Sequence, residues 1–243
     1  MILYVNGDSH SAGAEAVNSY CFADEDINYR HLGKTHHPDN LKASYGQVLA
    51  NNLDYKLTCD AESGSSNTRI LRTTYSYLEK TTPDLIVIGW ATWERQEWMF
   101  GEKYYQFSAG MNSANLPKEI AEVYKKWVVT RTQQHIYCKY WQERIWQLHQ
   151  NLISKQIPHL FFNTFSNLLS FKEGAIPCGS EVTKLDWGDS YLDPYSQQET
   201  YWNWLSELGY QTVNKNSFHF GADAHQAWGD RLTKLINESI ITK

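Results

Sequence analysis

The feature that most constrains this chain is an apolar run at its start that breaks into Gly-Asp-Ser. Residues 1–5 read Met-Ile-Leu-Tyr-Val and are followed at once by Asn6, Gly7, Asp8 and Ser9. Such a pattern is typical of a buried strand that ends in a tight turn. We therefore expect Ser9 at the carboxyl end of a strand, with its amide opening a helix and facing a developing anion. The same residues also fit an ordinary turn with a Ser or Asp helix cap.

Strand and helix patterns alternate along the rest of the chain. Helical connections between strands imply a parallel sheet with right-handed crossovers, so we predict one α/β domain over residues 1–243, a three-layer α/β/α sandwich with a central parallel sheet. Further strands are expected at 55–59, 85–89 and 159–165, with an edge strand at 210–213. Helices are expected at 43–53, 67–80, 197–208 and 222–241, two more within 116–155, and loops at 17–38, 90–115 and 170–195.

Composition excludes several classes of partner. The net charge of -5 gives no electrostatic reason to expect nucleic acid or an acidic membrane surface. The four cysteines are far apart in sequence, which favours free thiols in a reducing compartment. Neither a signal peptide nor a membrane span is apparent, so we expect a cytoplasmic location. Ten Trp and sixteen Tyr are many for 243 residues. Some are expected at the surface, where such rings often bind sugars or partners, and a Trp-rich core is the equal alternative.

A serine nucleophile requires a base, and the base requires an acceptor that orients it. His219 is the candidate base, because it lies just before the last predicted helix and so on a loop at an edge of the sheet. His225 falls inside that helix, where a packing role is expected. Asp223 and Asp189 are carboxylates that could orient the base from elsewhere.

Four sequence blocks resemble those of the SGNH (GDSL-type) hydrolase family. Gly7–Gly13 resembles the first block, Glu62–Asn67 the second, Leu85–Thr92 the third and His219–Trp228 the fourth, in the right order along the whole chain. The resemblance implies a flavodoxin-like fold and ester hydrolysis without a cofactor or metal. It implies that Ser9 attacks, that His219 takes its proton, and that the amides of Ser9 and Gly64 bind the oxyanion.

Two positions depart from the family pattern. The third block usually carries an asparagine that donates to the oxyanion, and Ala91 or Thr92 stands there instead. The Thr92 hydroxyl and the Asn67 amide are the candidate replacements. The family's aspartate three residues before the histidine is Asn216 here, which could accept the imidazole N–H; a backbone carbonyl is the alternative.

The stretch Gly89–Arg95 resembles a divergent branch associated with bacteriophage genomes, which implies the host cytoplasm or a virion as the location. Trp90, Trp93 and Arg95 are expected beside the pocket, with Arg95 either holding an anionic group or pairing with Glu94. The expected substrate is a small-molecule or glycan ester, with an acetyl ester of a sugar as the specific hypothesis. The acyl group, the alcohol and the oligomeric state stay open.

Two other functions compete with ester hydrolysis. The same fold without activity would be a binding module for glycan or protein, as the missing Asn and Asp allow. A metallophosphoesterase is the second rival, because Asp8 and His10 form the Asp-x-His pattern of its first motif, although its later motifs are missing. His36, His37 and Asp39 are expected to form a solvated loop and not a metal site.

Overall fold

A four-stranded parallel sheet organises the computed structural model, which describes residues 1–19, 36–108, 110–111, 116–131, 134–169 and 182–240. Its strands lie in the order β2-β1-β3-β6. Counted among the parallel strands alone, this is the 2-1-3-4 order of flavodoxin-like sheets. The bounds are β1 Ile2–Asn6, β2 Lys56–Cys59, β3 Leu85–Trp90 and β6 His159–Asn163.

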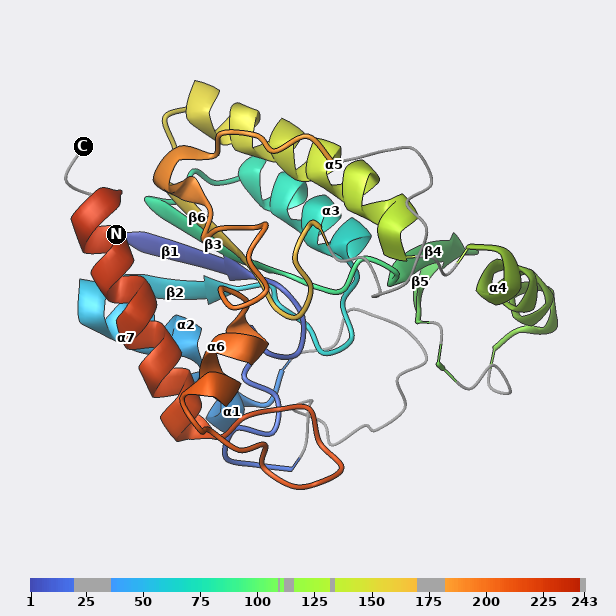
Figure 1. The fold of residues 1–243 in the computed structure, drawn as a ribbon, viewed down its shortest axis with the longest axis horizontal. Helices are drawn as coiled ribbons and strands as arrows, with labels where there is room; N and C mark the ends of the chain where they lie inside the picture. Colours follow the sequence, from blue (N-terminus) through green and yellow to red (C-terminus); the bar gives the residue numbers. More distant parts are fainter. Residues whose placement is uncertain (20–35, 109, 112–115, 132–133, 170–181, 241–243) are drawn as a thin grey trace.

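Helices cover both faces of this sheet (Figure 1). On one face lie α3 (Asn67–Leu78) and α5 (Gln134–Ser154), and on the other lie α2 (Tyr45–Leu53), α6 (Tyr201–Glu207) and α7 (Ala222–Ser239), with the short α1 (Pro38–Lys42) beside them. One apolar core forms between the sheet and each helical layer. The predicted three-layer α/β/α fold is therefore confirmed.

Apolar patterning explains why these segments form these elements. All six residues of β3 are buried, as expected for a central strand covered on both faces. The buried residues of α7 recur every three or four positions and face α2. Gly229 of α7 lies so close to α2 that a Cβ added there would be 2.6 Å from a methyl carbon of Val48. This contact fixes the two helices against each other.

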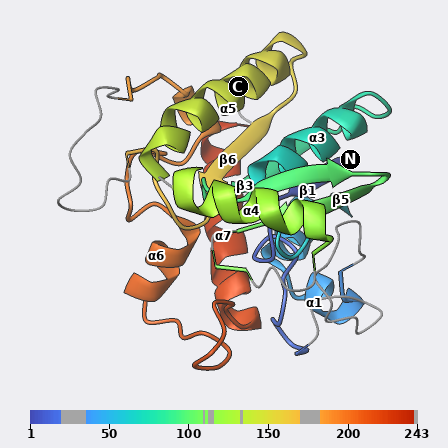
Figure 2. The same ribbon diagram turned by 90° about the vertical axis from the view of Figure 1, so that its right-hand side faces the viewer.

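The predicted loop over residues 90–115 is wrong in its middle. β4 (Gln96–Phe100) and β5 (Lys103–Phe107) form a two-stranded antiparallel hairpin that turns at Gly101, with φ +59°. The hairpin is stable because α4 (Lys118–Arg131) packs on it through Phe107, Tyr124 and Trp127. Figures 1 and 2 show α4 and the hairpin beyond the end of the parallel sheet.

The edge strand predicted at 210–213 is also wrong. Only an isolated bridge joins Thr212 to Phe220, so the chain returns before α7 as a loop. The two helices expected within 116–155 are confirmed as α4 and α5. Of the loop expected at 170–195, residues 182–195 contain the 3-10 turn Gly188–Ser190 and an isolated bridge from Tyr191 to Phe161 of β6. Residues 170–181 lie outside the described residues, as do 20–35 of the loop expected at 17–38.

The described cysteines agree with the expectation of free thiols. Cys59 and Cys138 form no disulfide, while Cys21 and Cys178 lie outside the described residues. No helix in the described ranges combines the length and the apolar character that crossing a membrane requires.

Candidate active site

The turn after β1 is built to hold Ser9 at the carboxyl edge of the sheet. The Asn6 side chain accepts the N–H of Gly7 and donates to α3, while Asp8 Oδ1 accepts the N–H of His10. A Cβ on Gly7 would lie 2.0 Å from Ser11 Oγ, so the turn closes only around a glycine. Ser9 itself is 5% exposed at the start of this turn.

Two backbone amides at this edge, those of Ser9 and Gly64, have no protein acceptor among the described residues. The loop that carries Gly64 is held by the buried pair of Arg69 and Glu62, 2.6 Å apart, and by the bond from Arg69 to the Asp60 carbonyl. Gly64 has φ +87°, a conformation that favours glycine. Free, fixed N–H groups of this kind suit an oxyanion.

The orienting acceptor of His219 is Glu15, a residue that the sequence analysis did not consider. His219 Nδ1 donates to Glu15 Oε2 at 2.5 Å, and Ser217 Oγ donates to the same oxygen at 2.7 Å. Because an ionised carboxylate only accepts, Nδ1 carries the proton and Nε2 is left free to act as a base. The hydrogen bond from His219 lowers the pKa of Glu15, against the opposite effect of its partial burial.

Glu15, and not Asn216, therefore contacts the imidazole. The Asn216 side chain is exposed, and its backbone N–H donates to Asn214 Oδ1. The other two carboxylates considered are also engaged elsewhere: Asp223 accepts the N–H of Ala224 at the start of α7, and Asp189 borders a cavity at the amino end of β6. The backbone of Glu15 is unusual, since it is a non-glycine residue with a positive φ of +62°.

His219 lies beside the Ser9 turn. Its ring centroid is 5.0 Å from that of His10, the residue after the serine. In Figure 1 the loop that follows β1 and the loop that precedes α7 run side by side near the sheet edge. Within the described residues, Ser9 Oγ and His219 form no direct hydrogen bond, and the bonds of the His219 side chain go to Ser217 and Glu15.

The two predicted replacements for the missing asparagine have different surroundings. The Asn67 side chain pairs with both backbone groups of Ala91, donating to its carbonyl at 3.0 Å and accepting its N–H at 2.8 Å. Thr92 Oγ1 is buried and has no partner among the described residues. Asn67 thus links α3 to the end of β3.

The predicted substrate contacts of Trp90 and Trp93 are wrong. Both side chains are 0% exposed, and Trp93 donates its indole N–H to the Asn167 carbonyl while its own carbonyl accepts from Trp141 of α5. Because α5 packs over Trp90 and Trp93, both side chains belong to the apolar core. Arg95 does reach the site, where it donates to Asp8 Oδ2 at 3.2 Å and to the Ser65 carbonyl at 3.4 Å.

The ion pair between Arg95 and Asp8 also bears on the metallophosphoesterase alternative. Asp8 faces the guanidinium of Arg95, a fixed positive charge where a metal ion would have to bind. Burial raises the pKa of Asp8, and Arg95 opposes that shift. Burial also lowers the pKa of His10, so this imidazole is neutral. Across the described ranges, no three His, Cys, Asp or Glu side chains gather as a metal site.

His225 has the packing role expected for it. It is buried in α7, and its Nδ1 accepts the N–H of Tyr45 at 3.3 Å. Burial lowers the pKa of His225 to about 3, so it stays neutral.

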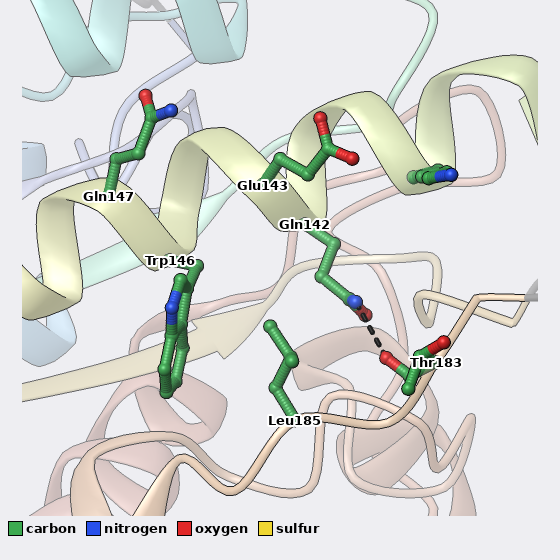
Figure 3. Close-up of a pocket in the computed structure, with 7 residues that line it drawn as sticks. Gln142, Glu143, Trp146, Gln147, Thr183 and Leu185 are labelled. Carbon is green, nitrogen blue, oxygen red and sulfur yellow. Dashed lines mark hydrogen bonds between the residues drawn. The ribbon is translucent and has the colours of Figure 1, made fainter.

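A cavity of about 390 Å³ lies elsewhere, between α5 and the segment that carries Thr183 and Leu185 (Figure 3). Trp146 and Leu185 line its apolar part, and Gln142 closes one side by donating to the Thr183 carbonyl. None of the site residues above contributes to it, so it is separate from the candidate active site.

The parallel strands have the flavodoxin-like order, and the first two sequence blocks follow the carboxyl ends of β1 and β2. No family model matches the sequence, and the search of curated proteins found no match. Among solved structures the chain is similar to a carbohydrate esterase (17% identity, TM-score 0.47, covering 98% of this chain and 65% of that one). It is also similar to a family two carbohydrate esterase from Clostridium thermocellum in complex with cellohexaose (15%, 0.43, 98% and 63%) and to the acetyl xylan esterase AlAXEase (13%, 0.43, 97% and 100%). The chain thus spans less than two thirds of the length of the first two.

Proposed function

We propose that this protein is a serine-dependent ester hydrolase that uses Ser9, His219 and Glu15. The observation that carries the proposal is the 2.5 Å contact between Glu15 and His219 Nδ1, formed beside a serine on a strand-end turn. The two free amides of Ser9 and Gly64 add a binding site for the charge that ester cleavage develops.

The reaction follows from these groups. His219 Nε2 takes the proton of Ser9 Oγ as this oxygen bonds to the ester carbonyl carbon, and the carbonyl electrons move to the oxygen, which the amides stabilise. The tetrahedral intermediate collapses, the alcohol leaves with the proton from His219, and an acyl group stays on Ser9. Water then attacks the acyl carbon while His219 Nε2 takes its proton. The bond to Ser9 Oγ breaks, His219 returns the proton to this oxygen, and the acid leaves. Glu15 keeps the imidazole in the required tautomer and stabilises its charged form.

The substrate class we propose is an acetylated carbohydrate. An aromatic cluster borders the site: Phe165 lies 4.8 Å from the His10 ring, and Trp202 lies 5.4 Å from Phe165 between ring centroids. Phe218, one residue before His219, continues this cluster and is 69% exposed. Exposed rings beside a nucleophile provide flat apolar surface on which a sugar face can pack.

Hydrolysis of p-nitrophenyl acetate by the wild type, Ser9→Ala and Ser206→Ala tests the chemistry. We expect Ser9→Ala to abolish turnover and the exposed α6 control Ser206→Ala to keep it. A fluorophosphonate probe followed by peptide mapping should modify Ser9. Turnover that survives Ser9→Ala contradicts the proposal, and EDTA-sensitive phosphatase activity would favour the metal enzyme. A wild type without esterase activity or labelling would favour the binding module.

Acetate release from an O-acetylated glycan tests the substrate class. The variant Phe218→Ala should raise KM for the glycan and leave turnover of p-nitrophenyl acetate unchanged, because the small ester does not need the ring. Cleavage of long-chain esters alone would contradict the carbohydrate hypothesis.

A further inference from the structure

The proposed oxyanion site has two backbone donors and lacks the side-chain donor that the third sequence block would supply. Position 91 is alanine, and the nearby Asn67 amide is held by the backbone of Ala91. A side-chain donor from another part of the chain would restore the three hydrogen-bond donors of the oxyanion site.

The side chain that lies over Gly64 comes from the hairpin. A Cβ built on Gly64 would be 2.9 Å from Gln106 Nε2 and 3.1 Å from Gln106 Oε1, so the carboxamide of Gln106 rests on this glycine. Gln106 Oε1 is buried and has no hydrogen-bond partner in the described part of the chain. A buried carboxamide with an unpaired end is costly unless a ligand completes it. The two ends of a carboxamide have the same shape, so rotation can present the N–H groups to an anion.

An ion pair fixes the hairpin in this position. Arg72 of α3 donates to both carboxylate oxygens of Glu97 in β4, at 2.9 and 2.8 Å, and its guanidinium lies 4.0 Å from the ring centroid of Tyr104 in β5. Glu97 is directly opposite Gln106 in the hairpin register. Opposite residues of an antiparallel pair point to the same face, so the clamp on Glu97 also positions Gln106.

We propose that Gln106 is the third oxyanion donor of this site, supplied by the β4–β5 hairpin in place of the third-block asparagine. The inference rests on the proposed ester hydrolysis. As Ser9 Oγ attacks, the carbonyl oxygen that gains the electron pair accepts N–H bonds from Ser9, from Gly64 and from the Gln106 carboxamide.

The test measures kcat and KM for p-nitrophenyl acetate in Gln106→Leu, Gln106→Glu and Thr92→Val. Leu keeps most of the volume and Glu keeps the shape, but neither donates as the carboxamide does. We expect both Gln106 variants to lower kcat by about 10²–10³, with KM within about threefold of wild type, as for the loss of one oxyanion donor. Thr92→Val tests the rival donor that the sequence predicts, and Ser206→Ala, the exposed α6 control, should stay within about threefold of wild type.

Each outcome separates this inference from the proposed function. If Ser9→Ala is inactive while both Gln106 variants keep wild-type kcat, the inference fails and the ester hydrolase stands. If Thr92→Val shows the loss instead, the donor is Thr92. If the wild type has no esterase activity, both proposals fail. Thermal unfolding of each variant verifies folding, and Gln106→Glu decides the result if Gln106→Leu does not fold.

Discussion

Glu15 shows how much of the proposed chemistry depends on one side chain. Its backbone has a left-handed conformation, which residues with a Cβ adopt at a cost in free energy. Its carboxylate accepts hydrogen bonds from Ser217 and His219 of the loop before α7. Strain of this kind persists where surrounding contacts determine it, which fits a residue that orients a base.

Glu15→Gln tests this role, since it keeps the shape and removes the charge. We expect kcat for p-nitrophenyl acetate to fall by up to about 10⁴, the loss that follows when the acid of a Ser-His-Asp enzyme becomes an amide. Asn216→Ala is the matched control and should retain activity, because its side chain is exposed. The reverse pattern would restore Asn216 as the orienting residue.

The sequence pattern predicts the positions of candidate residues that lie where strands end or helices begin, and it does not predict contacts made by other segments. Ser9 and Gly64 follow apolar strands, and His219 precedes a helix, so the pattern of the chain is enough to put each of them at one edge of the sheet. Glu15 could not be found in this way, because it stands in a run of small residues and meets His219 only through a contact 204 positions away. Trp90 and Trp93 read as exposed aromatics of a loop, and only the packing of α5 shows them to be core.

At the scale of elements, the β4–β5 hairpin is the part that sequence patterning missed. Its strands are five residues each and form no part of the main sheet, so they depend on α3 and α4 for stability. Arg72 makes the link to α3, and the Glu97 carboxylate that it pairs with is buried.

Arg72→Met should therefore destabilise the protein, because it leaves Glu97 buried and unpaired. We expect a loss of about 2 kcal/mol in the free energy of unfolding, less than for a fully buried pair since the Arg72 side chain is partly exposed. Urea denaturation measures it. Arg144→Met, which removes an exposed arginine over Tyr140, should cost less than about 0.5 kcal/mol. Equal losses in the two variants would argue against the clamp.

For the whole molecule, buried neutral histidines determine how stability responds to acid. Burial lowers the pKa of His225 to about 3 and that of His159 to about 4, and it lowers the pKa of His10 as well. The unfolded chain binds protons at these side chains as the pH falls through about 6.5, while the folded chain does not. Stability is therefore lost as the pH falls from about 6.5 toward these lower values. The raised pKa of Asp8 acts in the opposite sense.

We expect the free energy of unfolding to decrease between pH 6.5 and 4, with each such histidine contributing up to about 1.4 kcal/mol per pH unit. His225→Asn, whose Oδ1 can accept the Tyr45 N–H in place of Nδ1, should make this slope shallower by about one proton. Urea denaturation across the pH series provides the slopes. An unchanged slope in His225→Asn would show that the buried imidazole already titrates in the folded state.

Ser9 and Glu15 belong to the same short stretch, which has a consequence for how this site can vary. Two of the three proposed catalytic groups come from this one segment after β1, and only the imidazole comes from the far end of the chain. The loop before α7 can then change in length or composition, provided that it still brings the His219 ring and the Ser217 hydroxyl to the Glu15 carboxylate.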